Sequence, residues 1–156
     1  MDRTPEYDLG IVDALAQLSF LVWGTVAKKA TGHDLSMIQT RLLGVLRDRE
    51  PSMQQLATML ELDKSSVTGL VDRAERRGLV TRTVSAQDRR AFRVSLTAFG
   101  RSLVDQVAGE FQQELTSMLA DLSADERSAL SSLASRVVVA YAAHQDVDLL
   151  SVPQPF

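Results

Sequence analysis

Residues 56–82 read LATMLELDKSSVTGLVDRAERRGLVTR and contain two short amphipathic segments separated by the break ELD. Asp63 is suited to begin the second segment as a helix, because its side chain can accept a hydrogen bond from a backbone N–H group, and Gly78 is suited to end it. The apolar positions of this segment recur at helical spacing: Val67, Leu70, Val71 and Ala74. Two short helices joined by a tight turn predict a helix-turn-helix over this stretch.

Helical periodicity also precedes this stretch, and it predicts helices over residues 8–30, 36–48 and 52–60. The second and third of these helices each open with a capping box. In such a box a serine oxygen accepts a hydrogen bond from the backbone three residues on, and the glutamine there accepts one from the serine N–H. The two boxes are Ser36-x-x-Gln39 and Ser52-x-x-Gln55.

After the helix-turn-helix the sequence changes from helical to strand periodicity. Residues 79–84 are rich in β-branched side chains, and residues 91–96 alternate between apolar and polar positions. The polar stretch between them carries Asp88, Arg89 and Arg90. The pattern predicts a β-hairpin with a basic tip, which makes the whole unit a winged helix-turn-helix.

Two longer helices follow the hairpin. Thr97 is suited to cap a helix that runs to about residue 120, and Ser123-x-x-Glu126 is a third capping box that opens a helix to about residue 143. The fold class is therefore predicted to be mostly α with a small β-hairpin wing.

Positive charge is concentrated in the middle of the chain, although the formal net charge is −3. Residues 47–101 carry 11 basic and 7 acidic groups, whereas residues 102–156 carry 2 and 8. A centre that binds a polyanion, held on an acidic scaffold, has this distribution. Ordinary surface charge with chance clustering is the alternative reading.

The second helix of the pair has the composition of a DNA reader. A helix fits the major groove of B-DNA, small hydroxyl side chains allow close approach, and the hydroxyls can donate to phosphate or base acceptors. An arginine on a narrow hairpin can enter a minor groove, and Asp88 can orient an adjacent guanidinium or tie down the loop. The predicted DNA-binding residues are Lys64, Ser65, Ser66, Thr68, Gly69, Arg73, Arg76, Arg89 and Arg90.

These motifs resemble the MarR family of winged helix-turn-helix transcriptional regulators. The segment DRRAFRVSLT, residues 88–97, is similar to the wing motif of that family, with matches at Asp88, Arg90, Leu96 and Thr97. The resemblance extends over essentially the whole chain. It implies a sequence-specific DNA-binding regulator that acts on a pseudo-palindromic operator as a homodimer, commonly as a repressor released by a small aromatic ligand.

On this resemblance the chain divides into three parts. Residues 1–35 form an N-terminal dimerisation helix, residues 36–97 the winged helix-turn-helix DNA-binding domain, and residues 98–156 the C-terminal dimerisation helices. Apolar stripes on the terminal helices exceed what the winged domain needs, and an intertwined dimer would bury the surplus. Two recognition helices would then stand about 34 Å apart, one turn of DNA.

Several side chains admit two readings. Arg90 is expected in the minor groove and Arg89 on a phosphate, against the alternative of solvated loop arginines. Arg76 or Arg77 could pair with Asp72 or Glu75 along the helix instead of contacting DNA. Arg93 could lie on the outer strand face without touching DNA.

A second class of function is a winged-helix module that binds an acidic protein partner. That function calls for apolar anchors on the outward face of residues 64–77, where the sequence has Ser, Thr, Gly and Arg. Phe20, Trp23 and Met37 could line a ligand cavity between the dimerisation helices and the winged domain, or they could be plain core.

Other chemistries find little support in the sequence. The chain has no cysteine, and its two histidines stand without a second ligand at metal spacing, so no cofactor or metal site is expected. No catalytic constellation is visible, so an enzyme is not expected. The N-terminus is not a secretory signal and no stretch of 18 apolar residues exists, so a cytoplasmic protein with no membrane span is expected.

Overall fold

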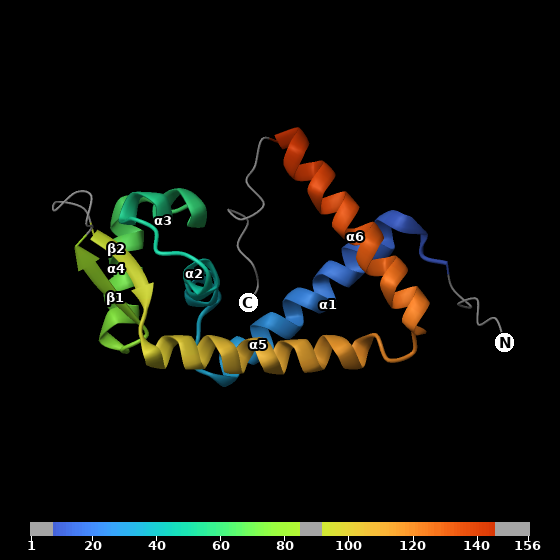
Figure 1. The fold of residues 1–156 in the computed structure, drawn as a ribbon, viewed down its shortest axis with the longest axis horizontal. Helices are drawn as coiled ribbons and strands as arrows, with labels where there is room; N and C mark the ends of the chain where they lie inside the picture. The colour runs from blue at the N-terminus through green and yellow to red at the C-terminus, as the bar shows by residue number, and fades with distance from the viewer. Residues whose placement is uncertain (1–7, 85–91, 146–156) are drawn as a thin grey trace.

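The computed structural model describes residues 8–84 and 92–145, and within them six helices and a two-stranded sheet. In chain order the elements are α1 (Gly10–Gly32), α2 (Met37–Arg47), α3 (Met53–Leu60), α4 (Lys64–Arg76), β1 (Val80–Val84), β2 (Phe92–Leu96), α5 (Ala98–Met118) and α6 (Ala124–Gln145). The predicted fold class, mostly α with a hairpin wing, is confirmed. Figure 1 shows α2, α3, α4 and the hairpin gathered at one end, with α5 leading from them toward α6.

The helices begin where the capping residues predict. Ser36 and Ser52 each complete a capping box with the glutamine three residues on. Ser123 and Glu126 make the same reciprocal pair, with N···O distances of 2.7 and 3.3 Å. These boxes satisfy backbone N–H groups that the first turn of a helix otherwise leaves without partners.

The core lies inside the winged domain and extends onto the first half of α5. The predicted apolar stripes of α2 and α4 are fully buried, and α3 contributes Leu56 and Leu60. From outside the domain, α1 contributes Val26 and Ala30, and α5 contributes Val104 and Val107. Helix α4 is therefore held by a continuous apolar core, which leaves its opposite face available.

The wing is an antiparallel hairpin in which Val80 pairs with Leu96 and Val84 with Phe92. Val94 is buried against the domain, whereas Phe92, at the start of the strand, remains 48% exposed. Ser52 forms an isolated bridge to Arg93. The segment before α3 thus braces the outer edge of the hairpin.

Thr97 joins the wing to α5. Its hydroxyl accepts from the N–H of Gly100 at 2.9 Å and donates to the carbonyl of Gly78 at 2.5 Å. A Cβ at position 100 would overlap the carbonyl oxygen of Leu79, so glycine alone permits this approach. Helix α5 is consequently fixed to the segment that follows α4.

Much of the apolar surface of α1 and α6 is unburied in the single chain. On α1 only Val26 and Ala30 are buried, and on the described part of α6 only Ala142 is. Exposed large apolar side chains cover the rest: Ile11, Val12, Leu15, Leu18, Phe20, Leu21 and Trp23 on α1, and Leu130, Leu133, Val137, Val138, Val139 and Tyr141 on α6. By length and mean hydropathy alone, α1 also meets the requirement for a membrane span. The sequence had predicted that the chain contains no such segment.

Candidate nucleic-acid interface

The outward face of α4 is polar and cationic. Asp63 caps this helix, as predicted, and Gly78 follows its last turn with a positive φ of 69°. Every exposed residue of α4 is hydroxylic or basic: Lys64, Ser65, Ser66, Thr68, Arg73 and Arg76. Gly69 is half-exposed on the same helix. The structure therefore brings together on one helix surface all the predicted readers that precede the wing tip.

The hydroxyl groups of the first turn are held by their neighbours. Ser65 Oγ and Ser66 Oγ donate to the two carboxylate oxygens of Asp63 at 2.5 and 2.6 Å, and the Ser66 N–H donates to the same carboxylate at 2.9 Å. Thr68 Oγ1 donates to the carbonyl of Lys64 at 2.8 Å. In this structure the hydroxyl hydrogens thus take part in hydrogen bonds within α4 and its N-cap. The sequence had predicted that these hydroxyl groups can donate to DNA.

These hydrogen bonds change the electrostatics of the helix start. The hydroxyl of Ser65, followed by the hydroxyl and N–H of Ser66, stabilises the charged carboxylate and lowers the pKa of Asp63 far below its ordinary value. Asp63 therefore keeps its negative charge at any physiological pH. A fixed carboxylate stands beside the cationic Lys64.

Arg73 folds back along α4. The nearest atom to a Cβ built at Gly69 would be Arg73 Nη1, at 3.3 Å. The guanidinium therefore lies one turn N-terminal of its own backbone, over the glycine. A fork of N–H donors at this place is suited to the two acceptors on the major-groove edge of guanine.

Arg82, which the sequence reading missed, ties the wing to α4. Its guanidinium contacts Asp72 Oδ1 and Glu75 Oε2, each at 2.6 Å, and its own N–H donates to Glu75 at 3.2 Å. Both carboxylates are one helical turn apart and face β1. The spacing of these carboxylates in the sequence could have indicated that they share a cationic partner. It does not indicate that Arg82 is that partner.

Arg76 and Arg77 do not make the side-chain ion pairs that were considered for them in the described part of the chain. Arg76 Nε donates to the backbone carbonyl of Asp72 at 3.3 Å. Arg77 Nη1 donates to the carbonyl of Asp34 at 2.7 Å, beyond the end of α1. Asp72 and Glu75 are bound by Arg82 instead, so Arg77 anchors the domain and Arg76 stays on the exposed face.

Arg93 lies on the side of the hairpin that faces the segment before α3. Its Nη1 donates to the carbonyl of Glu50 at 3.0 Å. With Arg49, Gln54 and Gln55 it lines an open hollow of about 520 Å³ beside α3. The position of this arginine is consistent with a role in bracing the wing.

Comparisons with known proteins agree on one family. Residues 33–91 match the MarR family model. Over this stretch, which includes the helix-turn-helix, the chain is similar to the MarR family. It is 28% identical over 131 residues, 81% of this chain and 79% of the other, to the HTH-type transcriptional regulator PecS of Dickeya dadantii.

Solved MarR-type structures share the fold. A mutant MarR from E. coli superposes with a TM-score of 0.71 at 21% identity, over 85% of this chain and 99% of that one. A mutant of S. aureus MepR bound to an oligodeoxyribonucleotide superposes with a TM-score of 0.64 at 21% identity, over 86% and 99%. In this chain, α3 and α4 form the helix-turn-helix, and β1 and β2 form the wing.

Three predicted residues, Asp88, Arg89 and Arg90, lie outside the described residues. The hairpin brings Val84 and Phe92 together at the base of that segment, where they are paired and about half exposed. The roles of the three tip residues stay predictions.

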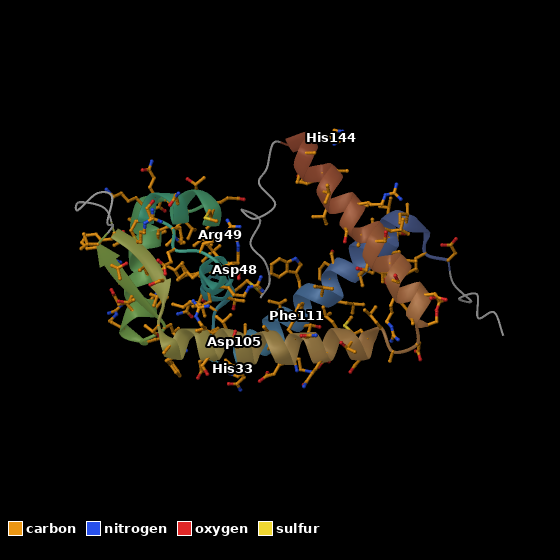
Figure 2. The ribbon with its side chains drawn as sticks, in the orientation of Figure 1. His33, Asp48, Arg49, Asp105, Phe111 and His144 are labelled. Atoms are coloured by element: carbon orange, nitrogen blue, oxygen red, sulfur yellow. The ribbon has the colours of Figure 1, made fainter. Side chains whose placement is uncertain are left out.

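The three residues suggested for a ligand cavity are exposed in the single chain. Phe20 is 84% exposed, Trp23 47% and Met37 36%, so none of them belongs to the core of the single chain. His33, which caps the C-terminal end of α1, bonds Glu110 of α5 at 3.0 Å, and Figure 2 shows it beside α5. Among the described residues no cluster of three potential metal ligands is found.

Proposed function

We propose that this MarR-family regulator is a homodimer that binds a pseudo-palindromic operator in duplex DNA and acts as a ligand-responsive repressor. One observation carries the proposal: every exposed side chain of α4 is hydroxylic or basic, while its apolar stripe is buried. Such a surface suits base edges and phosphates. It lacks the apolar anchors that a protein-binding module would need, which disfavours that alternative.

The unburied surface of α1 and α6 supports the dimer. Soluble monomers rarely expose contiguous apolar patches of such extent. On α6, Leu130, Leu133, Val137 and Tyr141 recur at helical spacing and are 36–65% exposed. A second copy supplies a matching apolar surface, because a twofold interface pairs each patch with itself.

A lipid bilayer is the competing partner for α1. The C-terminal half of this helix argues against it, because Lys29 pairs with Glu114 at 3.2 Å and His33 with Glu110 at 3.0 Å across the contact with α5. A spanning helix would have to carry α5 and its charges toward the membrane. We therefore propose a cytoplasmic protein without membrane attachment, and flotation with lipid vesicles tests this directly.

The tip of the wing completes the proposed interface. Arg90 enters the minor groove, Arg89 contacts a phosphate, and Asp88 orients one of the two guanidinium groups. Support comes from the hairpin strands, which end at Val84 and begin at Phe92, the two residues that flank this basic segment. Arg90→Ala is expected to weaken operator binding by about 1–3 kcal/mol if the minor-groove contact is specific.

A small aromatic effector is the proposed release signal. Phe20 and Trp23 project from α1, and Met37 stands at the start of α2, where a partner chain would turn exposed side chains into the walls of a cavity. An aromatic ligand there would contact both the dimer helices and the winged domain. A thermal-shift screen of phenolic acids, followed by DNA release, tests it.

Selection of genomic fragments by the purified protein tests the proposed function. One or a few duplexes with pseudo-twofold symmetry should be enriched, and their affinity should fall steeply as salt rises, because phosphate contacts release counterions. Binding that is equal for selected and scrambled duplexes would contradict the proposal. Loss of repression in a strain that lacks the gene would confirm that the protein acts as a repressor.

A further inference from the structure

We propose that Asp63 fixes the hydrogen-bonding polarity of the first turn of α4, so that this turn reads the amino groups of adenine or cytosine and rejects phosphates and acceptor edges. The inference deepens the proposed DNA-binding function and rests on it. It assigns Asp63 a positioning role and assigns Ser65, Ser66 and Thr68 an acceptor role.

The number of hydrogens on each group determines which group donates. A hydroxyl group has one hydrogen to donate and two lone pairs that accept. An ionised carboxylate and a backbone carbonyl have no hydrogen, so they can only accept. Ser65 and Ser66 must therefore be the donors in their 2.5 and 2.6 Å contacts with Asp63, and Thr68 must be the donor toward Lys64.

The exposure of the hydroxyl groups determines which hydrogen-bonding sites remain accessible to DNA. All three hydroxyl residues are exposed, and their hydrogens point back into the helix. Toward a ligand they present lone pairs alone. In the major groove, the N4 group of cytosine and the N6 group of adenine donate, whereas N7 and O6 of guanine, N7 of adenine and O4 of thymine accept. Only the amino groups match the first turn.

Charge reinforces this selection. The same hydrogen bonds keep Asp63 ionised, and an exposed carboxylate at this point opposes a phosphate that approaches the first turn. Lys64 stands next to it as an exposed cation and is free to take the phosphate to one side. One turn further along, Arg73 offers donors over Gly69 and prefers guanine. Along α4, hydrogen-bond acceptors therefore stand at the N-terminal end and hydrogen-bond donors about one turn later.

The test uses duplexes selected by the wild-type protein and by the Ser65→Ala and Ser66→Ala variants. Base pairs whose preference changes in either variant lie under the first turn. In the wild type, the contacted base at those pairs should be adenine or cytosine. If neither variant changes any preference while specific binding persists, or if guanine or thymine is selected there, the inference is wrong although the proposed function stands.

Base analogues separate donating from accepting hydroxyls. At a contacted adenine, purine removes the amino group, and 7-deazaadenine keeps the amino group but removes the N7 acceptor. Purine should weaken wild-type binding about fivefold, the value of one ordinary hydrogen bond, and 7-deazaadenine should weaken it less than about twofold. At a contacted cytosine, 2-pyrimidinone should have the effect of purine. The reverse order at adenine, or no loss with the amino-free base, would overturn the assignment.

Asp63→Asn provides the matched variant, because asparagine keeps the N-cap while its amide can donate to one serine and free that hydroxyl hydrogen. The variant should accept guanine or thymine at the mapped pairs and bind scrambled duplexes more tightly. Unchanged preferences in a variant with unchanged thermal stability would refute the role of Asp63. Absence of specific binding by the wild type would instead refute the proposed function.

Discussion

Arg82 of β1 and Asp72 of α4 are joined by an ion pair with an Nη2···Oδ1 distance of 2.6 Å. The same guanidinium binds Glu75, one turn along the helix, also at 2.6 Å. The Arg82 side chain is 21% exposed, so this link is more sheltered from solvent than an ordinary surface pair. It fixes the angle between α4 and the wing, the two elements that we propose enter neighbouring grooves of DNA.

Arg82→Ala leaves two carboxylates near each other without their shared cation. We expect a loss of about 1 kcal/mol in the free energy of unfolding, the upper value for partly exposed pairs, which corresponds to about 2–4 °C in Tm. Operator affinity should fall further than that, because the wing is no longer held in register with α4. Arg127→Ala, an exposed arginine at the start of α6, is the control of equal charge and should change neither quantity. An Arg82 variant with full operator affinity would remove the proposed coupling.

Gly69→Ala separates helix stability from DNA recognition. Alanine is the better helix former by up to about 1 kcal/mol, so thermal stability should rise. The new methyl group would lie 3.3 Å from Arg73 Nη1, and the guanidinium must move. Operator affinity should drop about three- to tenfold, as expected for a disturbed arginine–guanine contact. A more stable variant that binds as tightly as the wild type would show that Arg73 does not read DNA from over Gly69.

The helix starts, the buried stripes and the wing could be predicted because they depend on local rules. Capping boxes act over three residues, and the stripe of α4 requires only helical periodicity. Arg77 could not be assigned from the sequence, because its partner Asp34 is 43 positions away and is reached only when the helices pack. The role of Arg82 likewise depends on how the hairpin lies against α4.

The hydrogen-bonding polarity of the first turn of α4 could not be predicted from the sequence, for a different reason. The sequence shows which hydroxyl residues are present, but it does not show the rotamers that direct their hydrogens to Asp63. The exposure of Phe20, Trp23 and Met37 also required the packed structure. Apolar spacing indicates a surplus of apolar surface on the terminal helices, but it does not show which individual side chains are exposed in the single chain.

Gly100 is predicted to be far less replaceable than Gly109, although both lie within α5. A Cβ at position 100 would overlap the carbonyl oxygen of Leu79, whereas a Cβ at position 109 would meet nothing within 4 Å. Gly100→Ala should therefore destabilise the fold by about 3 kcal/mol, the upper part of the range for overpacking. Gly109→Ala should be neutral or stabilising by up to about 1 kcal/mol. Equal chemical-denaturation midpoints for the two variants would contradict the close approach of α5 to the wing.

The His33–Glu110 contact makes the stability of the fold depend on pH in a defined direction. The hydrogen bond from His33 lowers the pKa of Glu110 below its ordinary value of 4.5. A carboxyl group with a lowered pKa stabilises the fold fully above its unfolded pKa, and that contribution is lost as pH falls through the folded pKa. NMR titration of the Glu110 carboxyl carbon should show the lowered pKa, and His33→Ala should raise it toward 4.5. An unchanged titration in the variant would exclude this contact in solution.

The measurement that tests the account most directly is the mass of the purified protein, alone and on a selected duplex, by light scattering. The account predicts two chains in both cases, with the apolar faces of α1 and α6 covered by the partner. Val137→Asp, at a side chain that is 62% exposed in the single chain, should yield folded single chains that bind the operator poorly, while Ser132→Glu on the opposite side of α6 should not. A strictly monomeric wild type, or a single chain that binds the selected duplex with full affinity, would contradict the account.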